Sequence, residues 1–294
     1  MRVRHHRSAI AATIAAACVL ITACQPLHQT TPEGASPLRY RDPVFARVTK
    51  TADLTYGQAP KIDGTQQTLL LDLYQPTGDT VAKRPAIVWV HGGGFKNGDK
   101  TSPEIVDQAD AFARRGFVNV SISYRLTKGC APFTDECIRG IEMAYHDAQA
   151  AVRWLRANAA TYRIDPNRIA IGGSSAGGIT AYNVAYGSED PGTSGNPGYS
   201  SKVSAAVSLS GASLTTTVDP GEPPTLDFHG DKDGVVPMSW SDATLEQARK
   251  AKVIAERVVW KGDGHVPYSP HRKQIILETR NFLYAAMDLG NAER

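Results

Sequence analysis

Arg168-Ile-Ala-Ile-Gly-Gly-Ser-Ser-Ala-Gly-Gly178 is the stretch that decides the fold of this chain. Its apolar first half, Arg168–Ile171, is typical of a buried strand, and the segment after it, Ala176–Tyr186, is typical of a helix. Between them stands Gly173-Ser-Ser-Ala-Gly177, a G-x-S-x-G pattern in which the glycines permit a sharp turn. The pattern predicts that Ser175 is a nucleophile exposed at the top of a sheet. The alternative is a tight turn without chemistry.

A second glycine-rich stretch, Val88-Trp-Val-His-Gly-Gly-Gly-Phe95, ends another apolar run. Glycines let backbone N–H groups point into a site without an intruding side chain, and a tetrahedral oxyanion needs such donors in place. We assign this oxyanion hole to the N–H groups of Gly93, Gly94 and Ala176. His91 is expected to organise the loop by hydrogen bonding. The run matches neither the G-x-G-x-x-G nor the Walker pattern of a phosphate loop.

A serine hydroxyl is a weak nucleophile at neutral pH and needs a base, which in turn needs an orienting carboxylate. Three histidines follow Ser175 in the chain. We predict His265 as the base, because its glycine-rich loop comes just after a predicted strand and lets the ring reach over the sheet. His229 precedes the expected acid and is expected to fix the loop that follows it, and His271 to be exposed on a helix.

The acid is expected in the segment His229-Gly-Asp-Lys-Asp-Gly-Val-Val-Pro237, which offers two aspartates. We choose Asp233, which lies deeper in the turn, and expect Asp231 to cap or brace the loop. Asp263 stands two residues before His265 and is interpreted as a turn residue. The predicted catalytic residues are therefore Ser175, Asp233 and His265.

Apolar runs rich in Val and Ile alternate with amphipathic stretches along the chain. This alternation predicts an α/β fold with a doubly wound, mostly parallel sheet flanked by helices, in which ligands bind beyond the carboxyl ends of the strands. The expected strands are Leu69–Tyr74, Pro85–Val90, Phe117–Tyr124, Arg168–Ile171, Val203–Leu209, Thr225–Phe228 and Arg257–Trp260. The expected helices are Pro103–Arg115, Ile138–Ala160, Ala176–Tyr186, Ser239–Ile254 and Pro270–Met287.

The N-terminal residues are typical of an export signal. Residues 1–23 combine a positive start with an apolar stretch too short to span a membrane. The ending Leu20-Ile-Thr-Ala-Cys24 resembles a bacterial lipobox, which predicts acylation of Cys24 and a protein lipid-anchored to the cell envelope. The alternatives are an ordinary cleaved signal, giving a secreted protein, and a retained anchor. Residues 24–47 are expected to form a polar tether, and residues 48–294 the α/β domain.

Charge and cysteine content limit the partners and the metal sites that this chain can be expected to have. The three arginines of residues 1–23 account for the whole formal charge of +3, so the remainder is neutral and a nucleic-acid partner is excluded. The domain keeps two cysteines, Cys130 and Cys137, whose spacing in an exported chain favours a disulfide. The alternative is two unpaired thiols. Two cysteines are too few for a zinc site, and we expect no metal.

With these motifs in the right order, the chain from about Thr55 onward resembles the α/β-hydrolase superfamily, and within it the carboxylesterases with an HGGGF oxyanion motif. The matching residues are His91-Gly-Gly-Gly-Phe95, Gly173-Ser-Ser-Ala-Gly177, His229-Gly-Asp-Lys-Asp233 and the Gly264-His265 pair. The resemblance implies a serine esterase that works through an acyl-enzyme and needs no cofactor. It says little about the substrate.

Members similar to hormone-sensitive lipase carry a helical cap, whereas the gap from Leu209 to Thr225 is short here. We therefore expect no full cap domain, as in compact exported esterases that remove acetyl or feruloyl groups from polysaccharides. Whether the loop Gly187–Ser201 acts as a lid is left open. Two other functions stay in consideration: a serine peptidase of the same fold, and a non-catalytic surface binding lipoprotein, which would show decay in the catalytic residues.

Overall fold

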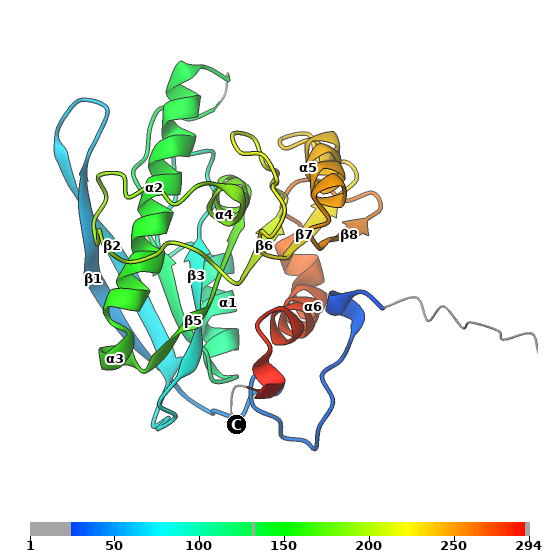
Figure 1. The fold of residues 1–294 in the computed structure, drawn as a ribbon. Coiled ribbons are helices and arrows are strands. Elements are labelled where there is room, and N and C mark those ends of the chain that lie inside the picture. The colour runs from blue at the N-terminus through cyan, green and yellow to red at the C-terminus, as the bar shows by residue number, and fades with distance from the viewer. Residues whose placement is uncertain (1–24, 131–132, 292–294) are drawn as a thin grey trace, which may run out of the picture.

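The computed structural model describes residues 25–130 and 133–291, and one eight-stranded sheet forms its centre (Figure 1). The strands lie in the order β1-β2-β4-β3-β5-β6-β7-β8. Pairing is parallel from β4 through β8 and antiparallel where β2 meets β1 and β4. The strands are β1 (Val48–Pro60), β2 (Gln66–Pro76), β3 (Arg84–Val90), β4 (Val118–Ile122), β5 (Ile164–Ser174), β6 (Ala205–Leu209), β7 (Thr225–Gly230) and β8 (Ala255–Trp260).

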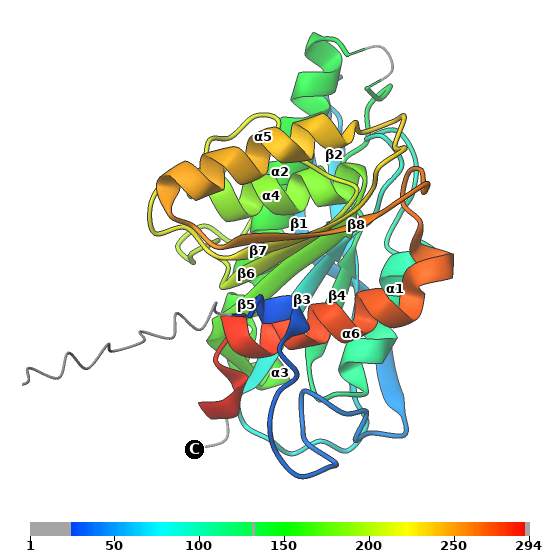
Figure 2. The same ribbon diagram turned by 90° about the vertical axis from the view of Figure 1, so that its right-hand side faces the viewer.

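Helices cover both faces of this sheet. Figure 2 shows α1 and α6 on one face and α2, α4 and α5 on the other. The α-helices are α1 (Pro103–Ala113), α2 (Asp135–Ala157), α3 (Ala159–Tyr162), α4 (Ala176–Tyr186), α5 (Met238–Ala251) and α6 (Tyr268–Ala286). The short 3₁₀ helices η1 (Leu27–Gln29) and η2 (Leu289–Asn291) lie against α6. The arrangement confirms the predicted doubly wound α/β fold.

The hydrophobic core is divided into two layers by the sheet. Successive strand residues point to opposite faces: Val88 and Val90 pack into the layer that contains α2 and α4, whereas Ile87 and Trp89 pack into the layer of α1 and α6. All four side chains are buried. Near-continuous apolar strands are therefore required here, because both faces are covered.

All seven expected strands and all five expected helices are present, with small differences at their ends. The strand β1 was missed because it is an edge strand whose residues are mostly exposed and polar, so it has no apolar run. The single turn α3 was missed as well.

The segment 25–47 contradicts the predicted tether. The backbone N–H groups of Leu27 and His28 donate to the Glu256 carboxylate at 2.6 and 3.0 Å. Tyr40 is 1% exposed and packs edge-on against Phe117. Isolated apolar side chains without a period predict a linker, yet Leu27 and Tyr40 pack into the core layer of α1 and α6. The packed domain therefore includes residues 25–47, while Cys24 and residues 1–23 lie outside the described residues.

The loop 187–201 lies along α2 and away from the predicted catalytic residues. The guanidinium of Arg153 donates to the carbonyl groups of Asp190, Pro191 and Gly195. None of the cavity-lining residues around Ser175 comes from this loop. It is therefore held against α2 and does not act as a lid in this conformation.

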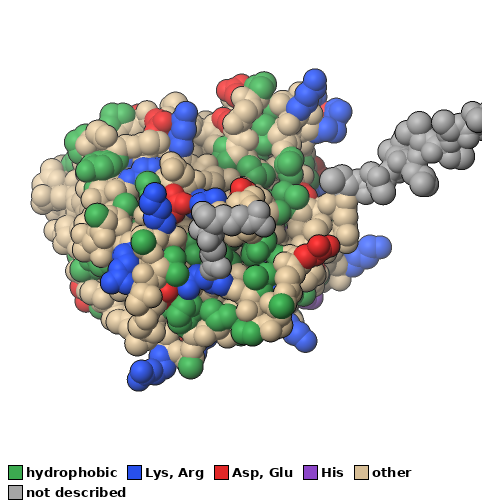
Figure 3. Space-filling model, turned by 60° about the horizontal axis from the view of Figure 1, so that its bottom comes forward, with side chains coloured by type: hydrophobic (Ala, Val, Ile, Leu, Met, Phe, Trp, Pro, Cys, Tyr) green, Lys and Arg blue, Asp and Glu red, His purple; other side chains and the backbone are tan. Residues whose placement is uncertain are grey.

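The connection from β6 to β7 contains no helix in the structure, and all of its residues are described. The expected absence of a full cap in this connection is thus found. Among the described helices, none is both long and apolar enough to cross a membrane. On the face shown in Figure 3, Lys and Arg side chains are scattered among hydrophobic and acidic ones instead of forming one patch.

Candidate active site

Ser175 occupies a strained turn between β5 and α4. Its backbone has φ 54° and ψ −119°, in a region that non-glycine residues rarely adopt. The neighbouring glycines are needed because the turn passes close to β3. A Cβ on Gly173 would lie 2.5 Å from the Gly177 carbonyl, and a Cβ on Gly177 would lie 2.0 Å from the Val90 carbonyl oxygen. The G-x-S-x-G pattern thus follows from close backbone packing.

The structure brings the three predicted catalytic side chains into one hydrogen-bonded chain. His265 Nε2 lies 2.7 Å from Ser175 Oγ, and His265 Nδ1 lies 2.7 Å from Asp233 Oδ2. They come from the connections after β5, β7 and β8, all at the carboxyl edge of the sheet. A neutral imidazole with its proton on Nδ1, held by the carboxylate, presents Nε2 as a base to the serine hydroxyl.

The Asp233 carboxylate is held in its charged form. Its side chain is fully buried, and burial pushes the pKa upward. The hydrogen bonds from His265 and from the N–H groups of Val235 and Val236 outweigh burial and leave the pKa of Asp233 below its usual range. The two N–H groups donate to Oδ1 at 2.8 and 2.9 Å, so Oδ2 is left for the histidine.

The other aspartates of the region have different partners. Asp231 Oδ1 accepts from the N–H of Gly262 at 2.7 Å and braces the two loops, as expected. Asp263 pairs with His271 Nε2 at 2.5 Å instead of with His265. His271 also stacks on Trp260, with ring centroids 4.0 Å apart. The expectation that His271 is simply exposed was therefore wrong.

The oxyanion loop turns through three successive residues with positive φ. These are Gly93 at 110°, Gly94 at 62° and Phe95 at 62°. A Cβ on Gly93 would lie 2.1 Å from the Asn97 carbonyl oxygen, so only glycine fits there. Gly93 and Gly94 line the same cavities as Ser175, and Ala176 is the first residue of α4. The loop therefore stands beside the serine, where its N–H groups can face a reacting carbonyl.

His91 is a structural part of this loop. It is fully buried, its Nδ1 donates to the Gly92 carbonyl at 2.6 Å, and its ring stacks on Tyr124 with centroids 4.2 Å apart. Burial lowers the pKa of His91, which favours the neutral ring. This environment agrees with the organising role predicted for His91.

Two residues support the predicted catalytic side chains: Ser210, which no sequence pattern indicates, and His229, whose role was predicted only in part. Ser210, which follows β6, accepts from the N–H of Val266 with Oγ at 3.0 Å and so anchors the residue after His265. His229 was expected to fix the following loop, and its Nε2 does donate to the Val236 carbonyl at 2.9 Å. Its Nδ1 lies 3.1 Å from Asp227 Oδ2, and both side chains are fully buried.

His229 also reaches the predicted acid, since its Nε2 lies 3.3 Å from Asp233 Oδ2. Burial lowers the pKa of His229, but the hydrogen bond and charge of Asp227 prevail and raise it above its ordinary value. The His229 ring therefore lies between Asp227 and Asp233, in contact with both carboxylates. No sequence motif indicates Asp227, because the histidine that pairs with a carboxylate inside an apolar strand can be identified only in the folded structure.

Two cavities meet at Ser175. The first, of about 250 Å³, has an apolar wall that includes Ile179, Leu214 and Trp240. The second, of about 450 Å³, is bordered by His265 and Glu104. Gly93 and Gly94 line both cavities.

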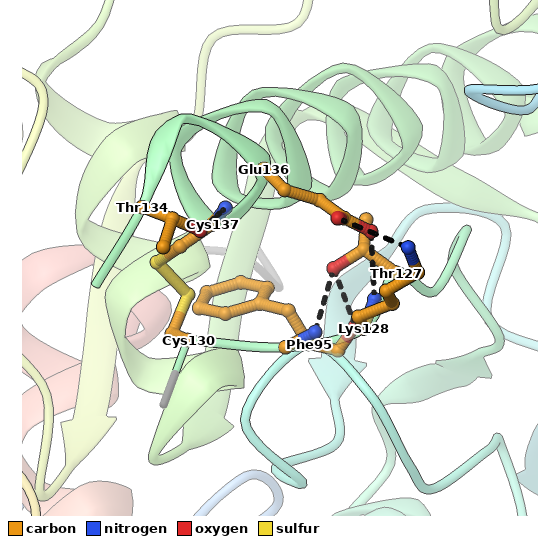
Figure 4. The surroundings of a disulfide bond; sticks show 8 residues. Phe95, Thr127, Lys128, Cys130, Thr134, Glu136 and Cys137 are labelled. Carbon is orange, nitrogen blue, oxygen red and sulfur yellow. Dashed lines mark hydrogen bonds and ion pairs between the residues drawn. A yellow bond between two sulfur atoms is a disulfide. The ribbon is translucent and has the colours of Figure 1, made fainter. Parts of the chain in front are cut away.

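The predicted disulfide borders the first cavity. Cys130 and Cys137 are bonded to each other, and Figure 4 shows the ring of Phe95 beside this bond. Thr134 caps α2 by accepting from the N–H of Cys137. Since Cys130 lines the cavity, the disulfide ties one of its walls to the first turn of α2. In the described part of the chain, no group of three or more His, Cys, Asp or Glu side chains is arranged to hold a metal ion.

Comparisons with known proteins agree with this geometry. Residues 71–213 match the BD-FAE family. The chain is 36% identical over 139 residues to phenmedipham hydrolase of Pseudarthrobacter oxydans, which covers 47% of this chain and 26% of that protein. It is 37% identical over 118 residues to mouse (Mus musculus) carboxylesterase 3B, which covers 39% of this chain and 20% of the relative. The chain thus spans about a quarter or less of these two relatives.

Solved structures match over nearly their whole length. Esterase 2 of Thermogutta terrifontis, phosphorylated by paraoxon, aligns with a TM-score of 0.65 and 26% identity, covering 80% of this chain and 94% of that one. The propionate-bound form of the same esterase gives a TM-score of 0.65 and 25% identity, with 86% and 98% covered. Motifs, sheet order and these likenesses agree: the chain belongs to the α/β-hydrolase superfamily and is similar to esterases within it.

Proposed function

We propose that this protein is a serine carboxylic-ester hydrolase that acts through an acyl-enzyme on esters of small or medium acyl groups. The observation that carries the proposal is the chain of 2.7 Å contacts from Ser175 through His265 to Asp233. Such a chain activates a serine hydroxyl at neutral pH, because the carboxylate orients the base that takes the hydroxyl proton. An intact chain also argues against a binding protein that has lost its catalytic residues.

The reaction follows from these contacts. His265 Nε2 takes the Ser175 proton as Oγ attacks the ester carbonyl, and Asp233 stabilises the imidazolium that forms. The N–H groups of Gly93, Gly94 and Ala176 hold the oxyanion. The C–O bond to the alcohol then breaks, and the proton on His265 passes to the departing oxygen. Water, deprotonated by His265, hydrolyses the acyl-enzyme and restores Ser175.

The size of the acyl group is inferred from the first cavity. Its volume of about 250 Å³ lies below the range of about 300–1,000 Å³ usual for ligand pockets, which favours short acyl chains or one aromatic acid. The matched Thermogutta esterase is described with propionate and with butyrate bound. The match to the BD-FAE family supports acetyl or feruloyl groups on carbohydrate as the natural esters.

The test is hydrolysis of p-nitrophenyl esters from acetate to palmitate, with the wild-type protein and Ser175→Ala. Fast turnover on acetate and butyrate, lost in the variant, is expected. A maximum at palmitate would refute the acyl-size part of the proposal. Equal rates with and without the serine hydroxyl would refute the nucleophile. An ester and its matched anilide, compared in the same assay, would reveal a peptidase by substantial turnover of the anilide, which an esterase leaves nearly uncleaved.

We also propose export and lipid anchoring through Cys24, on the strength of the signal-like residues 1–23 and the lipobox-like residues before Cys24. Expression of the whole chain in a bacterium with an alkyne-labelled fatty acid tests this. Label should be incorporated by the wild type and not by Cys24→Ser. Incorporation that survives this substitution, or none in the wild type, would contradict anchoring at this residue.

A further inference from the structure

We propose that the cavity on the His265 side of Ser175 binds the alcohol part of the ester, that it selects a polyhydroxylated alcohol without negative charge, and that Glu104 is its specificity-determining residue. The inference rests on the proposed ester hydrolysis and concerns the leaving group, which the three catalytic side chains alone do not define.

The position of the base decides which cavity takes the alcohol. The proton removed from Ser175 must be delivered by His265 Nε2 to the departing oxygen, so the alcohol leaves on the side where His265 stands. His265 lines the second cavity and is absent from the lining of the first. The acyl group therefore lies in the first cavity, against Leu214 and Trp240.

Glu104 places a fixed carboxylate in the alcohol cavity. It is in the first turn of α1, and its Oε1 accepts a hydrogen bond from Ser174 Oγ at 2.9 Å. Ser174 is buried and directly precedes the nucleophile, so the carboxylate is tied to the catalytic turn itself. Among the described residues, no hydrogen bond or ion pair reaches the second oxygen, Oε2, which is therefore available to a ligand.

The cavity continues into a neighbouring hollow of about 480 Å³, which shares Glu104 and Val266 with it. There Asp107 accepts from Tyr268 Oη and from the guanidinium of Arg272. We call the two together the leaving-group groove, lined by Ser102, Glu104, Asp107, Val266, Tyr268 and Arg272.

The chemistry of the groove favours hydroxyl groups. Carboxylate oxygens only accept hydrogen bonds, so a free Glu104 oxygen calls for a donor such as an alcohol O–H. An anionic alcohol would be repelled by Glu104, whose charge Arg272 does not offset because its guanidinium is paired with Asp107. A volume of about 450 Å³ is within the range of ordinary ligand pockets and accommodates a sugar ring.

The experiment compares two acetate esters that differ only in the alcohol: 6-O-acetylglucose and ethyl acetate. Losing a hydrogen bond to a charged group costs about 1.5–3 kcal/mol, or roughly 10–100-fold. We expect Glu104→Ala to lower the ratio of kcat/KM for the sugar ester to kcat/KM for ethyl acetate by at least about tenfold. Glu104→Gln, which keeps an acceptor oxygen, should fall between. Both rates drop somewhat, because the Ser174 contact is lost.

Asp110→Asn is the matched control, since Asp110 lies on the same helix and, in the described part of the chain, its carboxylate is hydrogen-bonded to Arg114 and to no groove residue. It should change neither ester. An unchanged ratio in Glu104→Ala would overturn the proposal and leave Glu104 as a support for the turn. A ratio that falls for acetylcholine instead of for the sugar ester would show a cation site and overturn it as well.

Binding of methyl glucoside to the Ser175→Ala variant, followed by saturation-transfer NMR, separates this inference from the proposed function. If the saturation transfer disappears in the double variant Ser175→Ala/Glu104→Ala, sugar binding in the leaving-group groove is supported even when no ester is hydrolysed. Normal ester hydrolysis without sugar binding would refute the groove alone.

Discussion

Replacing Gly177 with alanine tests how the catalytic turn is built. The added Cβ would lie 2.0 Å from the Val90 carbonyl oxygen and 2.7 Å from that of His91, whereas real Cβ contacts stay above 3.0 Å. Relief requires a movement of about 1 Å between α4 and the end of β3, from which the oxyanion loop continues. Alanine is a better helix former by about 1 kcal/mol. Overpacking costs about 1–3 kcal/mol, and a 1 Å misplacement can cost about 100-fold in rate.

We therefore expect Gly177→Ala to lose up to about 2 kcal/mol of unfolding free energy and roughly 100-fold in kcat/KM on p-nitrophenyl acetate. Urea denaturation and initial rates measure the two effects. Gly178→Ala is the control, because its Cβ would meet chiefly the Ser208 hydroxyl, at 2.8 Å, which can rotate away. If Gly177→Ala were as stable and as active as the control, the close packing of β3 on the turn could not be what requires a glycine.

Three further predictions concern charged groups. Asp233→Asn should lower kcat by roughly 10³–10⁴-fold. Because the pKa of Asp233 is depressed in the folded state, its carboxylate stabilises the fold above pH about 3.9, and this stabilisation is lost as the pH falls through the folded-state pKa. In urea titrations, the unfolding free energy of the variant should therefore decrease less at acidic pH than that of the wild type. His229→Gln should lower the unfolding free energy most below pH about 6.5 and least at alkaline pH, because the stability that comes from a raised histidine pKa is lost as the pH rises through that pKa. A difference in unfolding free energy between variant and wild type that does not depend on pH would contradict this. Asp147→Ala should lower the unfolding free energy by about 3–5 kcal/mol, because it leaves the buried Arg125 without its carboxylate partner. A second change, Arg125→Met, should restore part of this stability. Equal stability of the single and the double variant would argue against the buried ion pair.

The local motifs could be predicted because each is written in a few adjacent residues. Gly173 to Gly177 requires glycines on both sides of a strained serine, and the run after Val90 requires residues without Cβ. The choice of Asp233 over Asp231 also followed from its place in the turn, and the contacts to Val235 and Val236 show why that turn presents its carboxylate to His265.

Contacts between distant segments could not be read from the sequence. Glu104 stands 70 residues before Ser174, to which it is bonded, and nothing in the helix around Glu104 indicates that partner. Ser210 was overlooked because a single serine after a strand carries no pattern, although it anchors Val266. Segment 25–47 was misassigned for a related reason, because its burial depends on the surface that it covers and not on a period of its own. The edge strand β1 was missed because its residues are mostly exposed and form no apolar run.

Stoichiometric labelling with paraoxon tests the central claim most directly, because an organophosphate phosphorylates an activated serine hydroxyl far faster than an ordinary one. Phosphorylation forms a bond from Oγ to phosphorus and releases p-nitrophenol, which can be counted, and peptide mass spectrometry locates the group. The account predicts one p-nitrophenol per chain, a single diethylphosphoryl group on Ser175, loss of esterase activity in step with labelling, and no reaction after His265→Ala or denaturation. Complete inactivation with Ser175 unmodified, or a label on another residue, would contradict it.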